Sequence, residues 1–178
     1  MKIIFEDESI IVCIKPMGIL SQADSKGGES MITLLEEHTK GVIYPLHRLD
    51  KEVGGVMVYA KTKFAAASLS RDIAEQKFKK EYLALIHGKQ KKKGEMVDLL
   101  FKDSKKNKSF VVKKERRGVK KASLEYELIN SNDELSVVKI LLHTGRTHQI
   151  RVQFASRKMP LVADRKYGAK DEFNEIGL

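Results

Sequence analysis

The sequence predicts an α+β fold with a mixed, mainly antiparallel central sheet and flanking helices. Short apolar runs with alternating side chains recur along the chain, turn-rich segments separate them, and only three segments show helical spacing of apolar residues. A chain of 178 residues can bury a sizeable core, and this length argues against several domains. We therefore expect residues 1–178 to form a single domain.

The first half of the chain predicts two strands, two helices and a third strand. Residues 3–5 and 10–14 predict a hairpin around an acidic turn, and residues 31–37 predict a short helix. A longer helix is expected over residues 63–76, because Thr62 can cap its first amide groups and apolar residues recur at intervals of four. The apolar run 56–60, before this helix, is typical of a strand.

The second half predicts three strands and one helix. Side chains alternate over residues 79–87, and both faces of this strand are expected to be largely covered. Residues 124–129 and 135–142 predict a strand pair, because the four residues between them are strong turn formers. A helix is expected over 147–157, where two apolar side chains stand four residues apart.

Cysteine content and hydropathy indicate a cellular compartment. Cys13 is the only cysteine, which makes an intramolecular disulfide impossible and favours a reducing compartment; we expect it to be a buried core residue. The sequence shows no secretory signal pattern, and its apolar runs fall short of the roughly 20 residues that span a bilayer. We expect a cytoplasmic protein.

The charge of the chain favours a polyanionic partner. The net charge is +10 and the pI is about 9.6. Residues 102–121 contain ten Lys or Arg against two acids, with Lys105, Lys106, Arg116 and Arg117 among them, and strand-like residues interrupt the stretch. Solvated hairpin ends would also look basic, but acids elsewhere do not balance this excess. We expect this basic excursion to face a nucleic acid.

The segment 45–55 sets one carboxylate, Asp50, in a polar turn before the strand-like run. Arg48 precedes it by two residues, and the pair Gly54-Gly55 follows, permitting backbone angles and close approaches that other residues cannot adopt. This pattern fits an active-site loop. An ordinary turn at a strand entry would use the same residue types, so the residues alone leave both interpretations open.

Four segments, in order, resemble the motifs of the RluA-type pseudouridine synthases, which isomerise uridine in RNA. A chance match does not account for four short motifs in the right order over roughly residues 11–168. The segments are Lys15-Pro16-Met17-Gly18, His47-Arg48-Leu49-Asp50, Lys80 to Ala84 with Gly88, and Thr144 to Arg151, followed by Asp164 and Tyr167-Gly168.

The chain departs from the pattern of this family at two places. Val53-Gly54 stands where the family usually has Thr-Ser, which leaves the hydrogen bonding of the turn undetermined, while Gly55 remains. A further strand pair usually follows the Tyr-Gly motif, whereas this chain stops at Leu178. Whether the C-terminal strands are missing stays open at this point. Many relatives also carry an S4-type domain before the catalytic one, and we expect a catalytic domain without it.

The resemblance implies a set of site residues. Asp50 would be the catalytic carboxylate, either as nucleophile at the sugar carbon or as base toward its C2′ proton. Tyr82 would lie against the uracil, and Arg151 would pair with Asp50 and keep it ionised.

Three further residues are expected to contact RNA. Arg48 could enter the RNA stack as the target base flips out, or bind a phosphate. Arg146 and His148 stand near a helix start and are assigned to phosphate or loop contacts. The histidines lack cysteines or acids at ligand spacing, so no metal is expected, and the isomerisation needs no cofactor.

Three functions remain open. The leading one is a pseudouridine synthase acting on ribosomal or transfer RNA, between which the sequence does not choose. The second is a catalytically inactive basic RNA-binding or ribosome-associated module on the same fold. The third is an N-glycoside hydrolase, although no second carboxylic acid is evident as proton donor.

Overall fold

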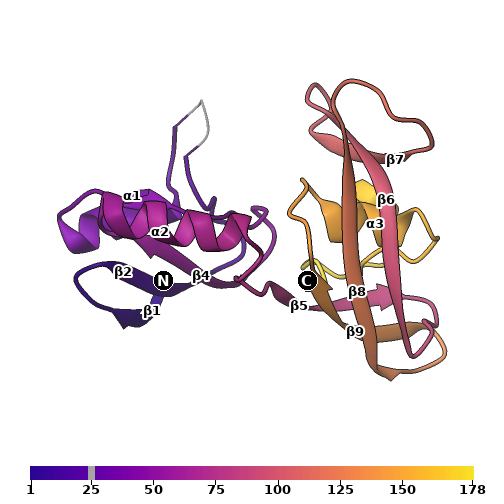
Figure 1. Ribbon diagram of the computed structural model, residues 1–178. Coiled ribbons are helices and arrows are strands. Elements are labelled where there is room, and N and C mark those ends of the chain that lie inside the picture. Colours follow the sequence, from indigo (N-terminus) through magenta and orange to yellow (C-terminus); the bar gives the residue numbers. More distant parts are fainter. Residues whose placement is uncertain (24–26) are drawn as a thin grey trace. The chain divides into compact units, whose positions relative to one another are not determined.

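The computed structural model describes residues 1–23 and 27–178, which divide into two compact units (Figure 1). The first unit runs from Met1 to Phe78 and the second from Lys79 to Leu178. Each unit has its own antiparallel sheet and its own core, so the α+β class is confirmed. The prediction that both belong to one catalytic domain stays a prediction. No helix in the described ranges is long and apolar enough to cross a membrane.

The first unit is a four-stranded sheet in the order β1-β2-β4-β3, with two helices on one face (Figure 1). Its elements are β1 (Lys2–Glu6), β2 (Ile10–Lys15), α1 (Met31–Thr39), β3 (Tyr44–Pro45), β4 (Gly55–Ala60) and α2 (Lys63–Ala74). The predicted hairpin, both helices and the strand at 56–60 are therefore confirmed.

Local sequence explains where the two helices begin and where the second one ends. Ser30 caps α1 in a capping box with Thr33, and Thr62 accepts a hydrogen bond from the Ala65 N–H at the start of α2. Helix α2 ends at Ala74, two residues earlier than predicted, because Gln76 adopts a left-handed φ of +58°.

The core of the first unit lies between α1 and the sheet. Its members are Ile11, Cys13, Met31, Leu35, Ile43, Met57 and Tyr59. Cys13 is fully buried, as predicted, and burial raises the pKa of its thiol to about 11. The thiol therefore stays protonated at neutral pH.

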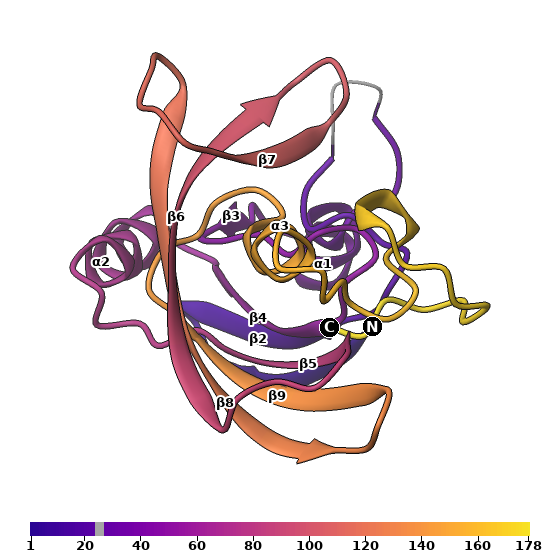
Figure 2. The ribbon, with the colours of Figure 1, turned by 90° about the vertical axis from the view of Figure 1, so that its right-hand side faces the viewer.

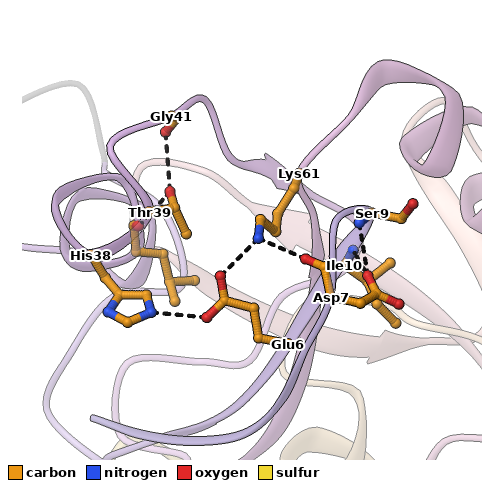
Figure 3. A network of polar contacts seen from close by, with 9 residues as sticks. Glu6, Asp7, Ser9, Ile10, His38, Thr39, Gly41 and Lys61 are labelled. Atoms are coloured by element: carbon orange, nitrogen blue, oxygen red, sulfur yellow. Dashed lines mark hydrogen bonds and ion pairs between the residues drawn. The ribbon is translucent and has the colours of Figure 1, made fainter.

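A polar network fixes the β1–β2 turn against the start of α2 and the end of α1 (Figure 3). Glu6 accepts from Lys61 Nζ at 2.7 Å and lies 2.9 Å from His38 Nε2. Asp7 accepts from the backbone N–H groups of Ser9 and Ile10 at 2.7 and 2.8 Å. The hairpin turn is thus held by charge pairs on one side and by a local aspartate turn on the other.

The second unit is a five-stranded antiparallel sheet in the order β5-β9-β8-β6-β7, which curves around α3 (Figure 2). Its elements are β5 (Glu81–His87), β6 (Lys93–Asp103), β7 (Lys108–Val112), β8 (Val119–Ser131), β9 (Leu135–Leu142), α3 (Gln149–Ala155) and a 3-10 turn at Arg165–Tyr167. The predicted strands at 79–87, 124–129 and 135–142 are confirmed, whereas the sequence pattern did not predict β6.

Helix α3 begins two residues later than predicted. His148 adopts a left-handed φ of +52°, so the helical conformation starts only at Gln149. The prediction for β5 was wrong on one face: Ala84 and Ile86 are buried against α3, but Leu83 on the other face is 63% exposed. That outer face carries charged neighbours such as the Lys139–Glu81 ion pair.

The C-terminal residues pack onto the edge of β5. The Leu85 N–H donates to the Gly177 carbonyl at 2.8 Å, and the Gly177 N–H donates to the Val162 carbonyl at 3.0 Å. Ile176 and Leu178 pack against the core of the unit. A Cβ at Gly177 would lie 2.7 Å from the Leu85 carbonyl oxygen, so this close approach requires glycine.

Candidate functional site

Main-chain hydrogen bonds close the turn that carries Asp50. The Val53 N–H donates to the Asp50 carbonyl at 3.1 Å, and the Gly18 N–H donates to the Lys51 carbonyl at 2.9 Å. Both bonds are independent of the side chains at positions 53 and 54. The departure from Thr-Ser therefore leaves the turn closed, and the Val53 side chain is buried instead.

Two residues from the first third of the chain hold this loop in place. Ser21 Oγ donates to the Leu49 carbonyl at 2.9 Å and accepts from the Leu49 N–H at 3.0 Å. Lys15 Nζ donates to the Lys51 carbonyl at 3.2 Å and to the Pro16 carbonyl at 2.9 Å. The residues on both sides of Asp50 are thus fixed to the body of the unit.

The electrostatics of this loop centre on Lys15, whose residue is fully buried. Burial lowers the pKa of its ammonium group, while the nearby charges of Glu52 and Asp50 act in the opposite direction. A buried ammonium group and two carboxylates are therefore close enough to interact electrostatically in this loop. Asp50 itself is partly buried, and Arg48 is exposed.

Gly55 takes the backbone angle that the pattern implied. Its φ is +153°, outside the range that other residues adopt easily, and it starts β4 opposite Lys15. At Gly54 a Cβ would lie 3.4 Å from the Lys15 carbonyl oxygen, so the loop passes close to β2.

In the second unit, the Thr144–Arg151 segment folds as a tight loop leading into α3. Gln149 organises it: its Oε1 accepts from Thr144 Oγ1 at 2.7 Å and from the Arg146 N–H at 3.0 Å, and its Nε2 donates to the Ser123 carbonyl at 3.1 Å. Arg146 Nε donates to the Lys121 carbonyl at 3.0 Å. The loop is thereby held against the edge of β8.

Arg151 lies on α3 and forms a buried ion pair with Asp164. Nε and Nη2 donate to the two carboxylate oxygens at 2.7 and 2.8 Å. The guanidinium carbon also lies 5.3 Å from the centre of the Tyr167 ring. His148, buried at the start of α3, lies with Nδ1 2.9 Å from the Tyr167 hydroxyl.

The remaining predicted site residues occupy two regions of the second unit. Tyr82 lies half-buried on β5, paired with Ile140 of β9. Lys105 and Lys106 are exposed in the β6–β7 turn, and Arg116 and Arg117 are exposed in the turn between β7 and β8. Arg116 stacks over the Phe101 ring at 4.7 Å.

The structure thus groups Arg48 with Asp50 in one loop, and Arg151 with His148 around Tyr167. The assignments of these side chains to catalysis or RNA contact stay predictions. Within residues 1–23 and 27–178, no group of three or more His, Cys, Asp or Glu is arranged to hold a metal ion.

Sequence reasoning did not assign roles to four residues that shape these sites. Ser21 has no local signal, since its partner is 28 residues away. Asp164 and Tyr167 belong to the late motif, but only the fold shows that they surround Arg151. Lys15 belongs to the first family motif, but the spacing of residues along the chain does not show that its side chain contacts the Asp50 loop.

Comparison with known proteins places these features in a family. The sequence pattern described as RNA pseudouridylate synthase matches residues 9–156, which include Asp50, Tyr82 and Arg151. An uncharacterized RNA pseudouridine synthase of Aquifex aeolicus is 38% identical over 182 residues, covering 96% of this chain and 57% of the relative. A ribosomal large subunit pseudouridine synthase D of Borreliella burgdorferi is 33% identical over 181 residues, covering 95% of this chain and 55% of the relative.

Solved structures share the fold. The human RNA pseudouridylate synthase domain containing 1 aligns with a TM-score of 0.82 and 22% identity, covering 99% of this chain and 74% of that one. The human RNA pseudouridylate synthase domain containing 4 aligns with a TM-score of 0.76 and 24% identity, covering 98% of this chain and 70% of that one. The chain spans just over half the length of the curated relatives named above.

Proposed function

Because this chain belongs to the RNA pseudouridylate synthase family, we propose that it converts uridine to pseudouridine in RNA. The observation that carries the proposal is the loop around Asp50. This carboxylate ends the family motif His47–Asp50. Main-chain hydrogen bonds and the buried side chains of Lys15 and Ser21 hold its turn in one conformation. Such fixing is what a positioned catalytic group requires.

In the proposed reaction the C1′–N1 glycosidic bond breaks and a C1′–C5 bond forms. The uracil turns in place between these steps, the C5 proton is lost to solvent, and N1 gains a proton. Atoms and electrons balance without redox change, so no cofactor is needed. Asp50 acts at the sugar, either as nucleophile at C1′ or as base toward C2′.

The second unit supplies the other proposed roles. In this proposal Tyr82 contacts the uracil and Arg151 acts with Asp50 during the reaction; Asp164 holds the Arg151 guanidinium through two hydrogen bonds. Arg48, exposed in the Asp50 loop, fills the stack or binds a phosphate when the target nucleotide flips out. Arg146 and His148 contribute phosphate or loop contacts.

The basic excursion 102–121 supplies the non-specific part of RNA binding. Its ten cationic residues lie on the end of β6, on β7, on the start of β8 and in the two turns between them, and most are exposed. Cations in such a position bind the phosphate backbone and release counterions. Several relatives bear names of ribosomal large subunit pseudouridine synthases, so we propose large-subunit ribosomal RNA as the first substrate to test, with transfer RNA as the alternative. We place this activity in the cytoplasm.

The decisive experiment is tritium release from RNA labelled at uridine C5. The unmodified protein, Asp50→Asn and a control, Asp133→Asn, are each incubated with ribosomal and with transfer RNA; Asp133 has a side chain 95% exposed in the β8–β9 turn. We expect release by the unmodified protein and the control, none by Asp50→Asn, and RNA affinities within a few-fold of each other. Substantial release by Asp50→Asn would overturn the assignment of Asp50. No release by the folded, unmodified protein would favour the inactive RNA-binding module.

A further inference from the structure

Tyr167 is the centre of a buried network in the second unit. Its residue is 9% exposed, and its hydroxyl accepts the Ser109 N–H at 2.8 Å and lies 2.9 Å from His148 Nδ1. The hydroxyl thus has two partners, the Ser109 N–H from which it accepts and the His148 ring nitrogen. The two rings meet edge to face, with centres 5.7 Å apart.

Cations flank the same ring. The Arg151 guanidinium carbon lies 5.3 Å from the ring centre and Lys108 Nζ lies 4.9 Å from it, both within the range of a cation–π contact. Burial raises the pKa of the Tyr167 hydroxyl, although the Ser109 N–H acts in the opposite direction. The phenol is therefore neutral at physiological pH.

This arrangement does more than fill space. Phenylalanine would fill the same volume, so packing alone gives no reason for a hydroxyl that must find partners when buried. The bidentate contact with Asp164 fixes one edge of the Arg151 guanidinium. The Tyr167 ring contacts the same guanidinium group, with 5.3 Å between the guanidinium carbon and the ring centre, and so adds a second constraint on its orientation.

The network also joins Arg151 to the hairpin formed by β6 and β7, whose turn and second strand belong to the basic excursion 102–121. Ser109 Oγ donates to the Thr147 carbonyl at 2.7 Å, and Lys108 Nζ donates to the Lys166 carbonyl. The first two residues of β7 are therefore attached to the segments on both sides of Arg151. The turn that precedes them carries Lys105 and Lys106.

We propose that Tyr167 is a positioning residue that fixes the orientation of Arg151 and ties it to the base of the RNA-contacting hairpin. This inference rests on the proposed function, in which Arg151 acts beside Asp50. It assigns Tyr167 no contact with the substrate. Tyr167 then sets the position of the Arg151 guanidinium relative to the RNA that the hairpin binds.

The test is Tyr167→Phe, which keeps the ring and removes only the hydroxyl. The matched control is Tyr126→Phe, because Tyr126 is buried in the same unit and its hydroxyl makes no hydrogen bond within the described residues. We expect Tyr167→Phe to lower the single-turnover rate of tritium release about tenfold, as small displacements of catalytic groups do. We expect the Kd for RNA to change less than threefold, and the control to match the unmodified protein in both.

A second measurement does not depend on activity. In a protein labelled with ¹⁵N, the Arg151 Nε–H signal is assigned by its loss in Arg151→Lys, and its exchange with solvent is followed. We expect Tyr167→Phe to speed this exchange severalfold, and Tyr126→Phe to leave it unchanged. Ser109→Ala removes the bond to Thr147 without altering Tyr167, and we expect a smaller effect in the same direction.

The outcomes separate the two proposals. A rate within twofold of the unmodified protein, or an unchanged Arg151 exchange, would overturn the role of Tyr167. The role of Tyr167 would also be overturned if weaker RNA binding by Tyr167→Phe accounted for its whole loss of rate. If the unmodified protein releases no tritium, the proposed function fails, and the exchange measurement still decides whether Tyr167 fixes Arg151.

Discussion

Arg151 and Asp164 form a bidentate ion pair that is almost wholly removed from solvent. The two N···O distances are 2.7 and 2.8 Å, and the side chains are 4% and 0% exposed. Taking two charges out of water is costly, and their attraction offsets that cost only while both partners are present. The pair therefore sets the position of Arg151 and makes that position strongly dependent on Asp164.

We expect Asp164→Asn to destabilise the protein strongly. It keeps the shape of the side chain but removes the buried negative charge that Nε and Nη2 of Arg151 contact, which lowers the free energy of unfolding by roughly 3–5 kcal/mol. Urea unfolding followed by circular dichroism measures this loss. Asp98→Asn is the matched control, because its ion pair with Arg157 is more accessible, with side chains 12% and 33% exposed. Equal losses in the two variants would contradict the special role of the buried pair.

Neutralising Lys105, Lys106, Arg116 and Arg117 together should weaken RNA binding and flatten its salt dependence. The slope of log K against log salt is negative, and each phosphate that the protein no longer neutralises makes it less steep by roughly 0.7–0.9. A binding titration at several salt concentrations measures the slope. A control variant with the same change in net charge neutralises exposed cations of the first unit, Lys2, Lys40, Lys63 and Arg71. If the two variants gave the same slope, net charge rather than the basic excursion would explain binding.

The sequence predicts elements whose cause is local. Alternation over 135–142 and the turn before it predict β9, and Thr62 predicts the start of α2, because periodicity and capping act within a few residues. The Asp50 turn was also predictable, since glycine and aspartate favour it locally.

Elements and contacts with a distant cause could not be predicted in this way. Strand β8 starts at Val119, inside a lysine-rich stretch, because Val119 pairs with Phe101 of β6 rather than because of its own pattern. Likewise, Ser21 meets Leu49 across 28 residues, and Arg151 meets Asp164 across 13. Such contacts depend on the tertiary arrangement, which spacing along the chain does not encode.

Glu6 should stabilise the first unit in a pH-dependent way. Hydrogen bonds from Lys61 and His38 lower the pKa of its carboxyl group below the ordinary 4.5 (Figure 3). A lowered pKa in the folded state contributes stability above the ordinary value, and this contribution is lost as the pH falls through the lowered one. Glu6→Gln should therefore have a lower Tm than Glu8→Gln at pH 7, and the difference should vanish in acid. Glu8 lies in the same turn and is exposed. A difference that persisted unchanged at pH 3 would contradict this origin.

Lys15→Met should reduce activity more than stability. The ammonium group donates to the Lys51 carbonyl beside Asp50, and without it that carbonyl keeps only the Gly18 N–H. Burial lowers the Lys15 pKa, because desolvation disfavours the charged form, and methionine fills a similar volume without a charge. The missing hydrogen bonds and the removed desolvation cost therefore offset each other, and we expect the free energy of unfolding to change by about 1 kcal/mol or less.

The Asp50 loop, in contrast, loses one of its two side-chain anchors, and we expect tritium release to fall about tenfold as the carboxylate becomes less well positioned. Single-turnover tritium release and urea unfolding on the same preparations separate the two effects. Lys63→Met, at the exposed first residue of α2, is the control and should leave both quantities unchanged. Unchanged activity in Lys15→Met would show that Ser21 and the main-chain bonds suffice to hold Asp50. A parallel loss of stability would instead make Lys15 a support of the fold rather than of the loop.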